Sequence, residues 1–360
     1  EHHGVIDRDL ENLPDEEQLR DRVSRGLGLM RPELAVLFSF SKITLYQDLV
    51  ASEVPEDPYL SRELEDYFPT HLRSEFTDLM AEHRLKREII ATRVTNNLVN
   101  RMGAYFAVRI KEDTGADSAT VAKAFTVARE IFEARSYWHR LETYDSTVCA
   151  DVQNGVYLEI WNLMRQSTRR LITLPGGFSI DISSRVNRFG PGMREFRDSL
   201  SEIVTGVERQ AMEDRRRDLE RAGFESDFAR RLAALGWMYS ALDVVDEARA
   251  LDLGVVEVGR TYFRLFDELC LRWLRESVEN LPVEKQWHAH ARGNLRDELF
   301  RHHRVLVERI LTEQRGAEDP VAGWMTAHGD TVGRTREMLE EMRATSTLDF
   351  ATLQVAVHGL

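Results

Sequence analysis

Apolar residues recur at intervals of three and four positions along most of this chain of 360 residues. Such spacing places side chains on one stripe of an α-helix, whereas a strand would alternate every second residue. The longest series predicts one helix that includes Leu85 and runs on until Gly115 stops it. Its apolar members are Ile90, Val94, Leu98, Met102, Phe106 and Ile110.

The same periodicity predicts a helix in nearly every other part of the chain. Pro32 suits the first turn of a helix, because the N–H that proline lacks is not needed there. The apolar run from this proline to Leu49 predicts a long, well-buried helix. Further helices are predicted over residues 118–132, 148–172, 208–221, 227–250, 255–279, 282–314, 320–343 and 348–357.

Two clusters of proline and glycine, at residues 174–177 and 189–192, interrupt this rhythm. They bracket a segment without helical period, which is typical of an exposed connector. The prediction is therefore an N-terminal helical subdomain over 1–173, a connector over 174–192 and a C-terminal helical subdomain over 193–360. The fold class is all-α, a multi-helix bundle with few or no strands.

The charge, apolar content and cysteines of the chain limit the partners and the compartment that we expect for it. Lys and Arg number 48 against 61 Asp and Glu, so the net charge is −13, which argues against a nucleic-acid binder. No uninterrupted apolar run reaches the roughly 18 residues of a membrane helix, so no membrane partner is predicted. Cys149 and Cys270 lie far apart without a CxxC pair, which favours small buried thiols in a reducing cytoplasm. The chain does not begin with Met, so we expect a processed product or a piece of a longer polypeptide.

The sequence contains few candidates for a catalytic, nucleotide-binding or metal-binding motif. The chain holds no GxGxxG turn, no GxxxxGK[ST] phosphate loop, no HExxH zinc helix and no GxSxG elbow. Histidines gather at His288, His290, His302 and His303, but Arg292, Arg296 and Arg301 lie among them and oppose a bound cation. Lys42 and Tyr46 lie one helical turn apart without an assignable acid or base. We therefore predict no catalytic, cofactor-binding or metal-binding residue in this chain.

One polar group is unusual, because it lies in the middle of a predicted helix. Arg93, Asn97 and Asn100 form a row at four- and three-residue spacing, and Arg101 adjoins it. Asparagine is a poor former of helix interiors, so the row needs a reason. Two interpretations remain open: a hydrogen-bonded contact between helices of this chain, or a docking surface for a neighbouring domain or subunit.

Several of these segments, in order along the chain, resemble a known family. The segments are residues 30–37, 41–49, 57–60, 67–69, 87–92, 97–103, 128–132, 273–275, 294–299 and 348–357. They resemble the region that follows the dehydrogenase domain in the large bacterial NAD-specific glutamate dehydrogenases. The resemblance covers nearly the whole chain and is most specific in its N-terminal half.

The resemblance implies that catalysis takes place in a different domain from this one. The full-length enzymes of that family oxidise L-glutamate to 2-oxoglutarate and ammonia, and they pass a hydride to NAD held in the upstream domain. The substrate lysine and nucleotide-binding glycines of that domain match nothing in this sequence. The resemblance thus implies an inactive, NAD-free C-terminal domain that serves assembly or regulation, docks on the upstream dehydrogenase domain and belongs to a homo-oligomer. The residues alone fit equally well a free-standing all-helical module that binds a protein or an effector.

Overall fold

The computed structural model describes residues 6–73, 75–283, 285–344 and 348–360, with Gln286 described by its backbone only. Every regular element in these residues is an α-helix or a short 3₁₀ helix, which confirms the all-α prediction. The residues form two compact units. Unit 1 holds the chain up to His139 together with Tyr157–Asn187, and unit 2 holds Arg140–Val156 together with Arg188–Leu360.

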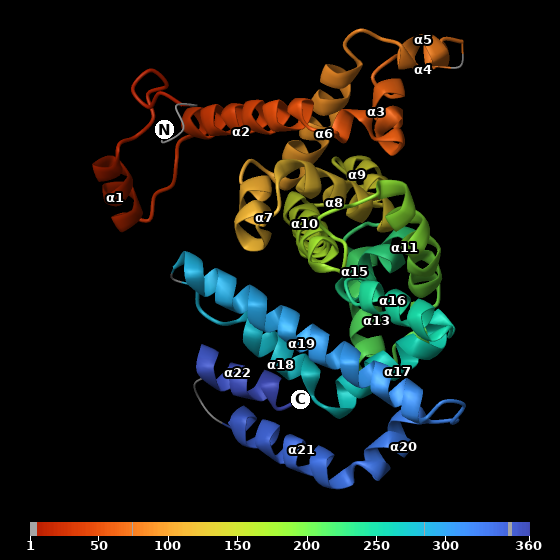
Figure 1. The fold of residues 1–360 in the computed structure, drawn as a ribbon. Coiled ribbons are helices and arrows are strands. Elements are labelled where there is room, and N and C mark those ends of the chain that lie inside the picture. Colours follow the sequence, from red (N-terminus) through yellow and green to blue (C-terminus); the bar gives the residue numbers. More distant parts are fainter. Residues whose placement is uncertain (1–5, 74, 284, 345–347) are drawn as a thin grey trace. The chain divides into compact units, whose positions relative to one another are not determined.

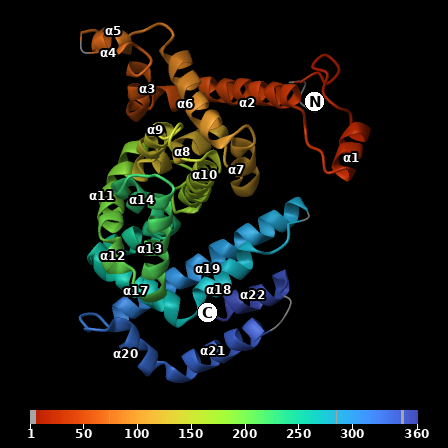
Figure 2. The same ribbon diagram turned by 180° about the vertical axis from the view of Figure 1, so that it is seen from behind.

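Figures 1 and 2 show the helices from opposite sides. Unit 1 contains α1 (Glu16–Ser24), α2 (Arg31–Ala51), the 3₁₀ helices η1 (Val54–Glu56) and η2 (Pro58–Leu60), α3 (Ser61–Glu65), α4 (Thr70–Arg73), α5 (Thr77–Ala81), α6 (Lys86–Met102), α7 (Phe106–Thr114) and α8 (Ser118–Ile131). The chain passes from one unit to the other inside α9 (Ala134–Glu142), α10 (Ala150–Thr173) and α11 (Ile182–Asp198).

Unit 2 contains the remaining helices. They are α12 (Leu200–Ile203), α13 (Gly206–Arg221), α14 (Ser226–Ala233), α15 (Leu235–Met238), α16 (Ala241–Leu251), α17 (Val255–Glu268), α18 (Leu271–Glu279), α19 (Gln286–Glu313), α20 (Pro320–Ala327), α21 (Gly329–Ala344) and α22 (Phe350–His358). The last helix, α22, packs against α18, α19 and α21 through its buried Leu353, Ala356 and Val357. The C-terminal segment is thereby part of this unit's core.

The long helix predicted from Leu85 to Gly115 is two helices. It breaks after Met102, where Gly103 adopts a φ of +86°, a conformation that other residues adopt only with strain. The four-residue series hides this break, because Phe106 resumes the apolar spacing at the start of α7. The periodicity therefore identified the buried faces and missed the turn between them.

The connector predicted over 174–192 is partly helical. Only residues 174–181 are irregular, since α11 begins at Ile182 and contains Gly190, Pro191 and Gly192. Pro191 is exposed and does not end the helix. A β-carbon at Gly192 would lie 2.6 Å from a methyl carbon of Val245, so close packing, and not a turn, explains this glycine. The division into subdomains 1–173 and 193–360 stays a prediction.

Three more predicted helices are interrupted in unit 2. The stretch 227–250 forms α14, α15 and α16, the stretch 320–343 forms α20 and α21, and the stretch 255–279 breaks at Cys270, where φ is +53°. Leu269 and Leu271 on either side of Cys270 are both buried, so the turn lets both contribute to the core. Pro282 precedes the helix that it was predicted to open, because α19 begins at Gln286.

Two predictions of burial are wrong. Cys149 and Cys270 are both exposed thiols. The helix of the Pro32–Leu49 segment, α2, exists as predicted, but only Glu33, Leu45 and Leu49 are buried on it. Its length and composition would also suit a membrane span, although a single such helix near the N-terminus is weak support for one.

Candidate functional site

The predicted polar row lies on α6, whose opposite face explains why the helix forms. Ile90, Val94 and Leu98 are buried at four-residue steps, and each such side chain contributes about 1.5–3 kcal/mol on burial. That apolar stripe directs the positions between its members away from the core. Arg93 and Asn97, one turn apart, therefore share a more polar face of the helix.

Arg93 and Asn97 are directed to one buried carboxylate, that of Glu63 on α3. Glu63 is only 1% exposed, so its charge requires compensation within the protein. Asn97 Nδ2 donates a hydrogen bond of 2.9 Å to Glu63 Oε2, and Arg93 Nε donates one of 3.3 Å to the same oxygen. The row thus contacts another helix of its own unit.

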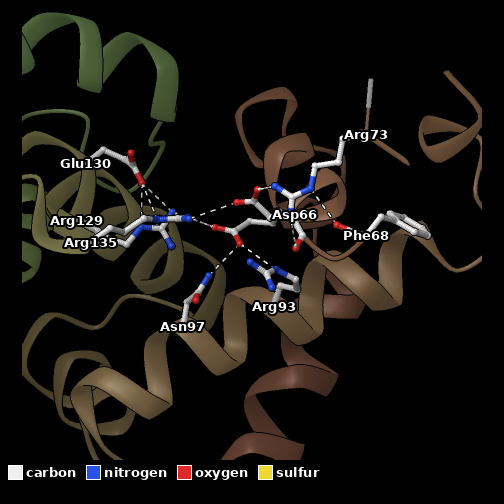
Figure 3. A network of polar contacts seen from close by, with 9 residues as sticks. Asp66, Phe68, Arg73, Arg93, Asn97, Arg129, Glu130 and Arg135 are labelled. Atoms are coloured by element: carbon white, nitrogen blue, oxygen red, sulfur yellow. Dashed lines mark hydrogen bonds and ion pairs between the residues drawn. The ribbon is translucent and has the colours of Figure 1, made fainter. Parts of the chain in front are cut away.

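The other oxygen of Glu63 is compensated from α8 and α9. Arg129 Nη2 lies 3.1 Å from Glu63 Oε1, and Arg135 donates a hydrogen bond to that oxygen as well. Arg129 is itself only 3% exposed. Figure 3 shows Arg93, Asn97, Arg129 and Arg135 converging from α6, α8 and α9. We call Glu63 and these four side chains the Glu63 cluster.

Two further carboxylates balance the arginines at the edge of the cluster. Glu130 lies 2.9 Å from Arg129 and 3.6 Å from Arg135. Asp66 lies 3.6 Å from Arg135 and accepts a 2.7 Å hydrogen bond from Arg73 (Figure 3). The guanidinium groups are therefore shared among carboxylates, which leaves little free positive charge for a ligand.

The electrostatics follow from this arrangement. Burial alone would raise the pKa of the Glu63 carboxyl, but Arg129, Arg135 and Arg93 together outweigh burial, so the pKa lies below its usual value. Burial, followed by the neighbouring Glu130, raises the pKa of Tyr59. Glu63 is thus a fixed anion, unsuited to proton transfer near neutral pH.

The Glu63 cluster has a structural role. It joins α3 to α6, α8 and α9 by charge-assisted hydrogen bonds, which are the stronger class in proteins. A hollow of about 260 Å³ beside it is lined by residues that include Tyr59, Arg62 and Glu130. No serine, cysteine or histidine contributes to the contacts described for the cluster.

The other half of the predicted row lies outside the cluster. Asn100 and Arg101 are both exposed, and the Arg101 guanidinium lies 5.1 Å from the centre of the Trp138 ring. The structure therefore divides the row: Arg93 and Asn97 make a contact between helices, while Asn100 and Arg101 face solvent. A docking role for Arg93, Asn97, Asn100 and Arg101 stays a prediction.

The other polar residues considered from the sequence are placed apart. Lys42 Nζ lies 5.1 Å above the Phe38 ring. His303 is buried with Nε2 3.0 Å from the Tyr262 carbonyl oxygen, and burial lowers its pKa to about 3. Glu298 pairs with His358 at 3.3 Å. In the described ranges, no three His, Cys, Asp or Glu side chains gather closely enough to hold a metal ion.

Sequence reasoning missed Glu63, Arg129 and Arg135. Glu63 lies on the five-residue helix α3, which is too short to show a period. Arg129 lies on α8, a helix rich in alanine and valine that the structure buries on nearly all sides. A charged residue within such a helix requires a buried partner.

Comparison with known proteins agrees with the resemblance found in the sequence. The family described as "Glutamate dehydrogenase, C-terminal" matches residues 26–360. The NAD-specific glutamate dehydrogenase of Pseudomonas aeruginosa is 37% identical over 100% of this chain, and that of Halomonas elongata is 35% identical over 99%. That of Mycobacterium tuberculosis is 30% identical over 99%.

The chain spans about a fifth of the length of these relatives, 22% in each. The family match extends over nearly all of the sequence, including α2, the Glu63 cluster and the whole of unit 2. The chain therefore belongs to the family of C-terminal regions of glutamate dehydrogenases.

Proposed function

We propose that this chain is a non-catalytic domain, serving assembly or regulation, of an NAD-specific glutamate dehydrogenase. The full-length protein would oxidise L-glutamate to 2-oxoglutarate and ammonia and reduce NAD. The observation that carries the proposal is the end-to-end match to relatives of that name, of which the chain covers only 22%. In a protein of that length, the catalytic residues would lie in the other four-fifths of the chain.

The assignment of NAD to another part of the enzyme is supported by the local structure of the described residues. A dinucleotide needs a glycine-rich turn between a strand and a helix, where backbone N–H groups reach the pyrophosphate. The described ranges contain helices joined by turns, and the arginines of the Glu63 cluster are already paired with carboxylates. NAD is accordingly assigned to the upstream part of the longer chain.

The partners follow from the same proposal. The principal partner is the upstream dehydrogenase domain of the same chain, and the complete enzyme is a homo-oligomer in the cytoplasm. The acidic net charge of −13 favours neither nucleic acid nor an anionic membrane surface as a further partner.

Three proteins test the proposal: the full-length chain, the full-length chain lacking this region, and residues 1–360 alone. We expect glutamate-dependent NADH formation by the first and none by the third at equal molar concentration. Turnover by residues 1–360 alone would refute a non-catalytic role. Loss of assembly or of rate in the truncated protein, judged by sedimentation and by initial velocity, would distinguish an assembly role from a regulatory one.

A further inference from the structure

The N-terminal part of α2 is an apolar helix surface that the described chain covers only in part. Residues 34–40, Leu-Ala-Val-Leu-Phe-Ser-Phe, cover two turns that are apolar except at Ser39. None of them is buried: Leu34, Ala35 and Ser39 are exposed, and the other four are half-buried. Leu34 is 51% exposed, and Ile43 one turn beyond this stretch is 45% exposed. A helix that is apolar all round normally lies inside a protein or a membrane.

The exposed surface extends toward the start of the chain. The described residues include nineteen large hydrophobic side chains that are exposed, and six of these lie between positions 10 and 43. That segment is only about a tenth of the sequence. They are Leu10, Val23, Leu27, Met30, Leu34 and Ile43. Exposed apolar side chains scattered singly are normal, but a concentration of this kind marks an interaction surface.

Each end of α2 makes specific contacts. Glu33 accepts a 2.6 Å hydrogen bond from the backbone N–H of Met30 and two hydrogen bonds, of 3.0 and 2.7 Å, from Arg22. At its other end, Leu45 and Leu49 are buried where α2 packs on α6, α8 and η1. Figures 1 and 2 both show the first turns of α2 lying away from α6. The exposed surface thus lies on a helix that packs on the unit at its C-terminal end and is tied to α1 at its N-terminal end.

A shallow hollow continues this surface onto α6. Its volume is about 190 Å³, and its lining includes Lys42, Ile43 and Tyr46 from α2 with Thr92 and Thr95 from α6. Thr95 is 2% exposed, and its Oγ1 has no hydrogen-bond partner in the described structure. A buried hydroxyl without a partner costs about 1–3 kcal/mol. An occupant with a small polar group beside an apolar side chain would remove that cost.

We propose that the first two thirds of α2 (residues 31–44) and the Thr95 hollow form the docking surface for the upstream part of the longer chain. The inference rests on the proposed function, because it takes its occupant from the relatives, in which this chain covers 22% and matches the C-terminal region. In a longer chain arranged like these relatives, the upstream part would join before residue 1, close in sequence to the concentration of exposed apolar residues. A tethered partner also has a high effective concentration at a surface so near the junction.

The surface fits a membrane less well. Residues 31–44 are roughly 21 Å long at about 1.5 Å per residue, which is shorter than the roughly 30 Å hydrocarbon core. A full span would have to remove Leu45 and Leu49 from their packing on α6 and α8. A helix lying on the membrane surface would need a strongly charged or polar face, to which residues 34–40 contribute only Ser39.

Photo-crosslinking in the full-length chain tests the proposal. A benzophenone amino acid is placed at Ile43, with a matched control at Leu79, which is 63% exposed on α5. We expect Ile43 to crosslink to a peptide that precedes residue 1, with a yield roughly tenfold above Leu79, as for a site that is occupied most of the time. Mixing isotope-labelled and unlabelled chains shows whether both peptides come from one chain.

A crosslink from Ile43 to a second copy of the chain, or a crosslinking yield equal to that at Leu79, would overturn the proposal. So would binding of the full-length chain to phosphatidylcholine–phosphatidylglycerol vesicles in a flotation assay, if α2 is the segment that binds them. Leu34→Asp gives a second readout, and because the Leu34 side chain is 51% exposed, we expect the variant to fold. It should accelerate tryptic cleavage of the junction roughly tenfold, while Leu79→Asp should not. Equal cleavage rates for the two variants would also contradict docking.

Assaying the same samples for glutamate-dependent NADH separates the two proposals. A crosslink without turnover would retain the docking surface and remove the proposed enzyme activity. Turnover without the crosslink would retain the activity and remove the docking surface.

Discussion

Glu63 shows at the scale of one residue how a carboxylate can stabilise a helical unit from inside. Replacing it by Gln keeps the shape but removes the buried anion that the arginines of the cluster share, which Glu130 and Asp66 compensate only in part. We expect Glu63→Gln to lower the free energy of unfolding of unit 1 by about 3 kcal/mol, because breaking a buried ion pair leaves an uncompensated charge. Hydrogen exchange of α6 amides measures this. The exposed Glu88→Gln on α6 is the control, and equal effects would contradict the argument.

The same residue predicts a dependence on acid. The pKa of Glu63 in the folded chain lies below its usual value of 4.5, so its stabilisation is complete above that pH and is lost as the pH falls through the folded pKa. The difference in stability between the original chain and Glu63→Gln should therefore shrink below about pH 4.5. Thermal unfolding between pH 7 and pH 3 checks this, and a constant difference would mean that the charge of Glu63 is not what stabilises the unit.

Glu247 in unit 2 is the opposite case. Burial first, and then Glu308, raises its pKa to about 7, and its Oε1 has no hydrogen-bond partner in the described structure. A raised pKa means that the folded state binds the proton more tightly, so stability falls as the pH rises from about 4.5 to 7. Glu247→Gln should remove that slope and stabilise unit 2 by on the order of 2 kcal/mol at pH 8. Melting temperatures across this range test it against the exposed Glu257→Gln, which should leave the slope unchanged.

At the scale of helices, α11 shows why composition misled the connector prediction. Gly190 and Gly192 both lie inside the helix, but a β-carbon at Gly190 would approach only the end of the flexible Arg194 side chain, at 3.5 Å. At Gly192 it would meet the stiff Val245. We expect Gly190→Ala to stabilise the chain by about 0.5–1 kcal/mol and Gly192→Ala to destabilise it by about 1–3 kcal/mol. Thermal unfolding of the two variants compares them, and effects of the same sign would contradict this account.

The helices that the sequence predicted correctly are those whose apolar period is uninterrupted. The predicted 118–132 and 148–172 correspond closely to α8 and α10, because their buried faces follow the spacing of three and four residues. Breaks such as Gly103 and Cys270 escaped, since the period resumes in register after one turn. For the site, Arg93 and Asn97 were recognisable as polar residues within a helix. Their partner Glu63 was not, because the contact joins residues about thirty positions apart.

At the scale of the whole molecule, the chain divides into two compact units, and the substitutions proposed above lie in different ones. Glu63 contacts residues of unit 1 only, and Gly192 faces Val245 of unit 2. Effects at sites without shared partners usually add within about 0.5 kcal/mol. We therefore compare the double variant Glu63→Gln with Gly192→Ala to the two single variants by hydrogen exchange. The exchange rates in unit 1 should rise as much as in Glu63→Gln alone, and those in unit 2 as much as in Gly192→Ala alone. By contrast, Glu63→Gln combined with Arg129→Met should cost much less than the two single changes together, because each removes the same buried pair. Coupling above about 1 kcal/mol between Glu63 and Gly192 would show that the two cores unfold as one.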